Sequence, residues 1–368
     1  SMRLSPTLTW YFGKHVLFSI LAVLALLIGL ILIGDTIELL RRAGGKPDAT
    51  VGIVVQMATS RIPFMTEKVL PFAVLFGSMF SFWKLTGNQE LVVTRAAGVS
   101  AWQFLLPPIL CALILGSIQV AALNPLSSIL LQRYEMLEAR YLQNNVSVMN
   151  LSSSGLWLRQ GTQDGQAVIY ARAVRSQQDD QIDLRNVTIF RFQNSDDFTT
   201  RIDAARAVLE PGTWHFYDAW TFTPGQASQF TESMKLPTNL TARKIQDSFA
   251  SPETMSFWDL KPFINLLERA GFNATRHRIH FHSLLSRPLL LCAMVLIAAA
   301  FCLKFSRRRR ASLVIGGGVT TGFILYFCTD VISALGVSGG IPPILSAWAP
   351  AGISLLLGVS TLLHLEDG

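Results

Sequence analysis

The stretch VLFSILAVLALLIGLILIG, residues 16–34, carries no charged side chain. An apolar run of about 18 or more residues is long enough to cross the hydrocarbon core of a bilayer as a helix. Three more stretches are also uncharged, at residues 96–132, 311–329 and 331–363. No soluble fold requires four such runs, so the sequence predicts a helical membrane protein.

The composition of the whole chain supports this prediction. Of its 368 residues, 50% are hydrophobic and only 15% are charged, whereas roughly a quarter of the residues in soluble domains are charged. The mean hydropathy is +0.39. The cysteines all lie in apolar segments, at Cys111, Cys292, Cys302 and Cys328. We interpret them as small buried apolar residues, and no disulfide framework is expected.

Working outward from residues 16–34 gives six transmembrane helices in two groups of three. We expect them at about 16–37, 52–85, 100–133, 278–304, 311–334 and 342–364. A short interfacial helix at 3–15 precedes the first, and a polar interruption at 86–98 separates the second from the third. The second helix is longer than the roughly 20 residues that a simple span needs, so its first part is expected to project beyond the bilayer.

Residues 140–255, between the two groups, differ in character, because charges of both signs are frequent there. Polar and apolar residues alternate over 167–174, 183–192, 201–209 and 214–222. Such alternation, with β-branched and aromatic residues and separating turns, is typical of an antiparallel β-domain. An amphipathic helix at about 257–270 follows. The predicted domains are 1–139, 140–255 and 256–368.

The distribution of basic residues predicts the orientation. Lys304 and the run Arg307–Arg310 form the densest basic cluster, in a short loop between two predicted helices. Such loops stay in the cytoplasm. Counting helices from there places residues 86–98 and both termini in the cytoplasm, and the β-domain on the far side of the membrane.

Four segments resemble one family. They are ELVVTRAAG (90–98), GLWL (155–158) followed by VIY (168–170), GIPP (340–343) and ELLRRAG (38–44). Their order and spacing are similar to those of the LptF/LptG (YjgP/YjgQ) permeases, the membrane subunits of the lipopolysaccharide exporter. The GLW and GIPP segments favour the LptG branch of the family over the LptF branch, and the resemblance runs over the whole chain.

The resemblance implies a fold, an activity and partners. The fold would be three helices, an inserted periplasmic β-jellyroll-like domain and three more helices, in the bacterial inner membrane. The chain would pair with an LptF-like permease, an LptB-like ATPase dimer and an LptC-like protein to extract lipopolysaccharide. No GxxxxGK[ST] loop occurs in the sequence, so the chain is not expected to hydrolyse ATP itself. No cofactor, metal or nucleic acid is expected.

The first candidate site is the interruption at 88–97. The resemblance implies a coupling helix that docks into a groove on the ATPase, with Leu91 and Val92 as apolar contacts and Glu90 and Arg95 as charges. The alternative is a solvated turn between two helices.

The second candidate site lies at the outer end of the first helix. Glu38, Arg41 and Arg42 are three and four residues apart and therefore share a face. Arginine binds phosphate in a bidentate manner, so lipid A phosphates are candidate ligands, with Arg133 as a further cation. The alternative is an ion pair of Glu38 with Arg41 or Arg42 that anchors the helix. Asp35 stands where the family has a lysine, which argues against a strict transfer of that position.

Other charges near membrane depth have no assigned role, although charges there are costly and usually face a cavity or a partner. They are Arg61, Glu67, Lys68, Arg287 and Asp330, besides Asp35.

Two other functions stay open: the LptF-type sister subunit, and a scaffold whose helices only anchor a periplasmic binding domain without transport.

Overall fold

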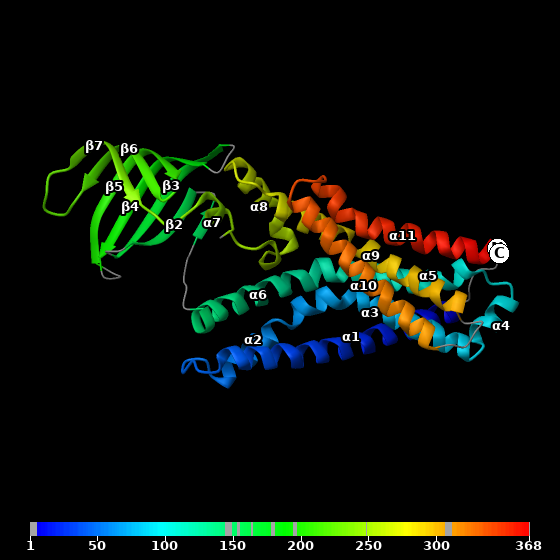
Figure 1. The fold of residues 1–368 in the computed structure, drawn as a ribbon. Helices are drawn as coiled ribbons and strands as arrows, with labels where there is room; N and C mark the ends of the chain where they lie inside the picture. Colours follow the sequence, from blue (N-terminus) through cyan, green and yellow to red (C-terminus); the bar gives the residue numbers. More distant parts are fainter. Residues whose placement is uncertain are drawn as a thin grey trace. The chain divides into compact units, whose positions relative to one another are not determined.

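The structure is a computed structural model. It describes residues 6–143, 149–152, 155–162, 165–177, 181–193, 197–247, 249–305 and 311–367. The chain divides into two compact units (Figure 1). The transmembrane unit comprises residues 1–143, 253–258 and 275–368, and the β unit comprises residues 144–252 and 259–274. The basic run Arg307–Arg310, on which the predicted orientation rests, lies outside the described residues, as does the side chain of Lys304.

Within the described residues, six helical segments are long and apolar enough to cross a membrane, which confirms the predicted class of fold. The first half of the unit contains α1 (Pro6–Ala43), α2 (Val51–Ser60), α3 (Ile62–Gly87), α4 (Glu90–Ala96), α5 (Ala101–Ile118) and α6 (Asn124–Glu138). The second half contains α9 (Thr275–Phe305), α10 (Ala311–Val337) and α11 (Pro343–Asp367).

The first span differs from its prediction. Residues 6–43 form one continuous helix, instead of an interfacial helix followed by a span at 16–37. Phe12 and Val16 lie on one face of α1 and are at most 1% exposed in the core of the unit. This apolar face continues past the polar residues Lys14 and His15, so nothing interrupts the helix.

The second span is broken, whereas one helix was predicted at 52–85. Arg61 separates α2 from α3, and Pro63 is the second residue of α3. Proline has no N–H to donate to the carbonyl of Thr59, so the hydrogen-bonding pattern of α2 cannot continue through it. The break places the charged Arg61 at a helix junction.

The third span runs to residue 143, ten residues beyond the prediction at 100–133, and contains two π-helical segments, η1 (Gln119–Leu123) and η2 (Ala139–Gln143). Pro125 follows η1 and cannot donate a hydrogen bond to the carbonyl of Ala121. The indole Nε1 of Trp258 donates to that carbonyl at 3.3 Å. A π-segment inside an α-helix is rare and is often found at functional sites.

The β unit contains one antiparallel sheet of seven strands in consecutive order. The strands are β1 (Met149–Ser152), β2 (Gly155–Thr162), β3 (Gly165–Gln177), β4 (Gln181–Gln193), β5 (Asp197–Glu210), β6 (Thr213–Phe222) and β7 (Gln229–Pro237). The four predicted segments lie in β3 to β6. Each strand pairs with its sequence neighbour, so the connectivity is that of a meander, without the crossover of a jelly roll among the described strands. The helix α7 (Ala242–Asp247) belongs to this unit. The one-turn η3 (Pro252–Thr254) and α8 (Phe257–Arg269) are divided between the units, because residues 253–258 belong to the transmembrane unit.

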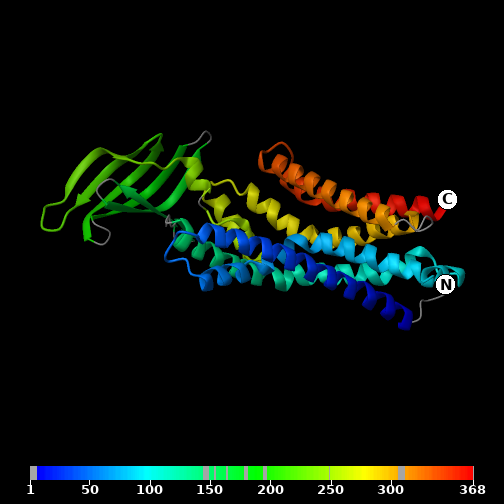
Figure 2. The ribbon, with the colours of Figure 1, turned by 60° about the horizontal axis from the view of Figure 1, so that its bottom comes forward.

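Different helices lie at the two ends of the transmembrane unit. Both views show α4, the start of α1, the start of α10 and the end of α11 at one end, which we call the α4 end (Figures 1 and 2). The opposite end holds α2, the end of α1 and the end of α6, and we call it the α2 end. The predicted coupling residues therefore lie at the α4 end, and the predicted phosphate-binding residues at the α2 end.

Candidate functional site

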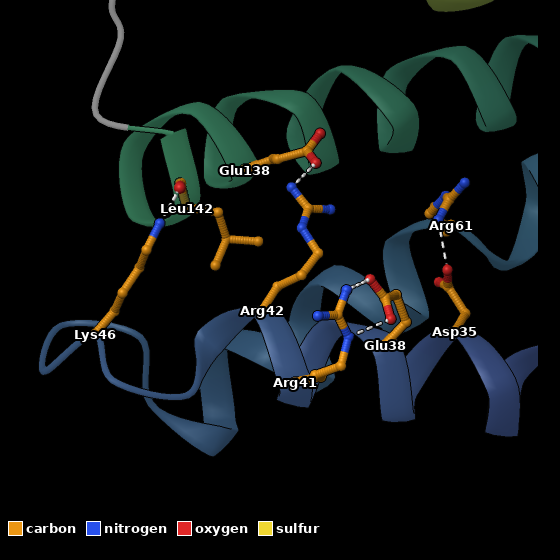
Figure 3. Close-up of polar contacts among 8 residues, drawn as sticks. All are labelled: Asp35, Glu38, Arg41, Arg42, Lys46, Arg61, Glu138 and Leu142. Carbon is orange, nitrogen blue, oxygen red and sulfur yellow. Dashed lines mark hydrogen bonds and ion pairs between the residues drawn. The ribbon is translucent and has the colours of Figure 1, made fainter.

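Arg41 and Glu38 form an exposed ion pair on the surface of α1 (Figure 3). The Nε of Arg41 donates to Oε2 of Glu38 at 2.8 Å, and its Nη2 donates to Oε1 at 2.6 Å. The side chains are 73% and 51% exposed. The alternative that the spacing left open, an ion pair within the helix, is thus present for Arg41.

Arg42 turns to a different partner. Its Nη2 donates to Oε1 of Glu138 on α6 at 2.6 Å, and the two side chains are only 32% and 20% exposed. Nearby, the Nζ of Lys46 donates to the carbonyl oxygen of Leu142 (Figure 3). These contacts join the end of α1 to the end of the third span, so Arg42 serves the packing of the α2 end.

Asp35 pairs with Arg61, at 2.5 Å between carboxylate and guanidinium (Figure 3). The guanidinium carbon of Arg61 also lies 4.9 Å from the ring centroid of Tyr134 on α6. Asp35 therefore neutralises the cation at the break between α2 and α3. A lysine at position 35 would face Arg61 with a like charge, so a carboxylate suits this helix junction.

Arg133 is exposed on α6, one turn before Leu137. Its neighbour Gln132 donates from Nε2 to the carbonyl oxygen of Thr254 at 2.8 Å. The four predicted lipopolysaccharide-binding residues thus lie at one end of the unit, but they differ in exposure and in ion pairing. Glu38 and Arg41 are an exposed pair, Arg42 is held by Glu138, and Arg133 is exposed. Sequence reasoning missed Glu138, because its partner is 96 residues away.

The interruption predicted at 88–97 contains the short helix α4. Gln89 has a left-handed backbone (φ 62°) and turns the chain from α3 into α4. The hydroxyl of Tyr11 donates to Oε2 of Glu90 at 3.1 Å, which ties α4 to the start of α1. Ser100 then begins α5 with a capping box that includes Gln103.

The side chains of α4 do not all face outward. Leu91 is 4% exposed and belongs to the core of the unit, so it is not available to a partner. Val92 and Val93 are 57% and 67% exposed. The exposed apolar residues of α4 are therefore Val92 and Val93, and Val93 was not predicted from the sequence. The side chain of Arg95 lies outside the described residues.

A buried polar cluster occupies the junction of α3, η1 and α6. Glu67 is 8% exposed, and the Nδ2 of Asn124 donates to its Oε2 at 3.3 Å. The Oδ1 of Asn124 accepts from the backbone N–H of Phe257 at 2.7 Å. Gln119 donates from Nε2 to the carbonyl oxygen of Glu67 at 3.4 Å. Asn124 and Gln119 were not predicted, although they are polar residues within an uncharged run of 37 residues, 96–132, and that is the signal that could have found them.

Of the remaining charges near membrane depth, Arg287 lies close enough to the buried Glu67 for the two opposite charges to attract each other. The Nζ of Lys68 lies 4.8 Å from the ring centroid of Phe64, and Asp330 is exposed on α10. Arg287 lies on α9 and is half-buried. Within the described residues, no group of three or more His, Cys, Asp and Glu side chains is arranged to hold a metal ion.

Comparison with known proteins identifies relatives along the whole chain. The profile of the family described as "Lipopolysaccharide export system permease LptF/LptG" matches residues 10–364. Two curated relatives are named "Lipopolysaccharide export system permease protein LptG", from Escherichia coli strain K12 and from Escherichia coli O6:H1 strain CFT073. Each is 24% identical over 367 residues, covering 96% of this chain and 97% of the relative.

Proposed function

This chain belongs to the LptF/LptG family of lipopolysaccharide export permeases, and on that premise we propose how its parts divide the work of export. It is a multi-pass membrane protein with six candidate spans and acts as a permease subunit of a lipopolysaccharide export ABC transporter. The family lacks an ATPase domain, so ATP hydrolysis is the task of another subunit. Homology to LptG implies the inner membrane.

Four partners complete the proposed assembly: an LptF-like permease, an LptB-like ATPase dimer, an LptC-like protein and lipopolysaccharide. The full-length match to two proteins named LptG supports the LptG role over the sister role. The sequence has no ATP-binding loop of the GxxxxGK[ST] type, which is consistent with a separate ATPase.

The proposed orientation places the α4 end in the cytoplasm and the β unit in the periplasm. The basic loop between α9 and α10 supports it, because short basic loops stay cytoplasmic. The thiol of Cys302, near the end of α9, lies 3.4 Å from the carbonyl oxygen of Met79, in the second half of α3. The loop after α9 and the helix α4 after α3 therefore share one side of the membrane.

In this arrangement α4 is the contact to the ATPase, through Val92, Val93 and Glu90. The exposed valines favour this role, because removing apolar side chains from water when a partner binds lowers the free energy of the complex. Tyr11 then connects Glu90 with α1, so that motion of α4 reaches a membrane-spanning helix.

The α2 end would receive the anionic headgroup. Exposed ion pairs contribute little to stability, so phosphate can displace Glu38 from Arg41 at small cost. Arg133 is a second exposed cation at that end. Arg42 is a weaker candidate, because a ligand would have to compete with Glu138.

Affinity purification of the full chain in mild detergent, followed by identification of bound proteins and lipid, tests the proposal. The expected result is an LptF-like permease, an ATPase and lipopolysaccharide. An LptG-like permease in place of the LptF-like one would assign this chain the sister role. Purification without an ATPase, while the periplasmic partner is retained, would support the anchored scaffold and overturn the proposal.

A further inference from the structure

Two residues of opposite charge lie on buried faces of α3 and α9. Glu67 is 8% exposed, and Leu70, one turn further along the same face of α3, is 4% exposed. Arg287 lies on α9 between Leu284 and Leu291, which share its face and are 1% and 0% exposed. Charged side chains inside a membrane are costly and usually have a partner or a function. Neither the coupling role of α4 nor the phosphate-binding role of the α2 end uses these two.

The packing of α3 on α9 brings the two charged residues to nearly the same level. Both helices end at the α4 end and therefore run in the same direction (Figures 1 and 2). The thiol of Cys302 lies 3.4 Å from the carbonyl oxygen of Met79, so positions at one level differ by 223 in number (302 minus 79). Arg287 is thus level with position 64, three residues before Glu67. At about 1.5 Å per residue the difference is roughly 4.5 Å, which a long arginine side chain can span.

Both side chains have hydrogen-bonding capacity that is not used within the described residues. The Oε2 of Glu67 accepts from Asn124, and Ser127 lies beside the same carboxylate, but the buried Oε1 accepts no hydrogen bond there. The guanidinium of Arg287 forms no direct hydrogen bond or ion pair with another described residue. It is nevertheless close enough to Glu67 for the opposite charges to attract each other. Burial strengthens this attraction, because the effective dielectric constant is lower inside the protein than in water.

The two residues belong to helices with different connections. The helix α3 continues through the turn at Gln89 into α4, the proposed contact to the ATPase. The helix α9 begins the second group of three. The hydroxyl of Ser286, next to Arg287, donates to the carbonyl oxygen of Ala347 on α11 at 3.3 Å. An attraction between Glu67 and Arg287 therefore connects the helix that leads to α4 with the second group of helices.

We propose that Glu67 and Arg287 form an electrostatic link that makes α9 follow α3 when the ATPase moves α4. The inference rests on the proposed function, because that function assigns ATP-driven movement to α4. The two side chains position the second group of helices and touch neither the ATPase nor lipopolysaccharide. Loss of the link should therefore uncouple ATP hydrolysis from export, while the complex still assembles and still binds lipopolysaccharide.

The test measures the amount of lipopolysaccharide exported per ATP hydrolysed by the purified complex in proteoliposomes. Arg287→Met leaves the charge of Glu67 buried without a counter-ion, so it should lower the unfolding temperature by about 5 °C and export per ATP by about tenfold. The neutral pair Glu67→Gln/Arg287→Met has no uncompensated charge, and its unfolding temperature should recover. Its export per ATP should stay about tenfold low, because the attraction is absent. Arg287→Lys retains the cation and should retain most of the export.

Lys68→Gln is the matched control, because it removes an exposed cation next to Glu67 in the sequence and should change neither measurement. Co-purification of the ATPase and binding of lipopolysaccharide without ATP are measured for every variant. Normal export per ATP in the neutral pair would overturn the link and leave the charges a purely structural role. Loss of the ATPase or of bound lipopolysaccharide from the neutral pair would overturn it as well. A wild-type complex without ATPase or lipopolysaccharide would instead overturn the proposed function itself.

Discussion

Arg41 and Arg42 are adjacent in sequence and yet differ in what they contribute. Successive residues of an α-helix point about 100° apart, so the two side chains leave α1 in different directions. Arg41 meets Glu38 in solvent, and Arg42 meets Glu138 between two helices. The first is available to a ligand, while the second holds the α2 end together.

This difference gives a first prediction. Arg42→Ala should destabilise the protein by about 1 kcal/mol, because Glu138 loses its partner in a partly buried site. Arg41→Ala should leave the unfolding temperature unchanged. Thermal unfolding in detergent measures both, and Glu138→Ala completes a double-mutant cycle. Equal effects of the two arginine substitutions would contradict the assignment.

Asn124 uses both ends of its side-chain amide, since it donates to Glu67 and accepts from Phe257. Asn124→Asp keeps the acceptor but places a second carboxylate beside Glu67. We expect a loss of about 2 kcal/mol, because a buried donor is removed and like charges are brought together. Adding Glu67→Gln to the Asn124→Asp variant restores a donor and should recover much of the loss in chemical unfolding. If stability did not recover in the double variant, the lost hydrogen bond between Asn124 and Glu67 would not explain the destabilisation.

At the scale of single residues, only part of the candidate site at the α2 end could be predicted from the sequence. The three- and four-residue spacing correctly brought Glu38 and Arg41 onto one face, since both lie on the same helix. The contacts of Arg42 with Glu138 and of Asp35 with Arg61 depend on how separate helices pack. Local spacing contains no information about such pairs.

At the scale of elements, glycines set the distance between helices. A Cβ at Gly77 of α3 would lie 2.6 Å from the Cα of Ile20 on α1. A Cβ at Gly116 of α5 would lie 2.5 Å from the Cα of Pro288 on α9. Both distances are below van der Waals contact, and the neighbouring atoms belong to the backbone. These helices therefore pack at a distance that only glycine permits.

Gly116→Ala should accordingly cost about 1–3 kcal/mol, the usual range for overpacking a tight interior. Gly29→Ala is the matched control, because a Cβ at Gly29 meets nothing within 4 Å. That change should be neutral or slightly stabilising, since alanine favours the helix. Unfolding temperatures of the two variants in the same detergent test whether α5 and α9 pack closely at Gly116. A Gly116→Ala protein as stable as Gly29→Ala would exclude close packing at this point.

The number of spans was predictable because hydrophobic length alone determines it. The break at Arg61 and the π-segment before Asn124 were not, although Pro63 and Pro125 are visible in the sequence. Pro71, Pro288 and Pro350 lie inside helices without ending them. Neighbouring helices can satisfy the freed backbone groups in some places and not in others, so a proline by itself does not predict a break.

The helix α4 carries the next prediction. Val93→Asp should weaken co-purification of the ATPase by about 10- to 100-fold, because a charge would enter an apolar contact. Val93→Thr preserves the shape and should have a much smaller effect. Leu91→Ala should destabilise the permease, by about 2–5 kcal/mol, and still allow the folded fraction to bind the ATPase. Full ATPase association in Val93→Asp would remove α4 from the interface.

At the scale of the whole molecule, the two proposed sites lie at opposite ends of the transmembrane unit. The exposed apolar residues of α4 lie where α1 begins, and the exposed cations lie where α1 ends. A transporter needs such a separation, because the ATPase works in water on one side while the anionic lipid is extracted at the other. The single uninterrupted α1, tied to α4 by Tyr11 and to α6 by Arg42, spans this distance.

This separation predicts that the two functions fail independently. Arg41→Ala/Arg133→Ala should reduce binding of lipopolysaccharide to the purified complex by roughly tenfold, as expected for the loss of charged hydrogen bonds. The ATPase should co-purify in normal amount, since the α4 end is untouched. Val93→Asp should show the reverse pattern, with lipopolysaccharide still bound and the ATPase lost. If the double arginine variant also lost the ATPase, or bound lipopolysaccharide normally, then the α2 end would not be the headgroup site, and the cations of α1 and α6 would serve only to anchor the helices at the membrane surface.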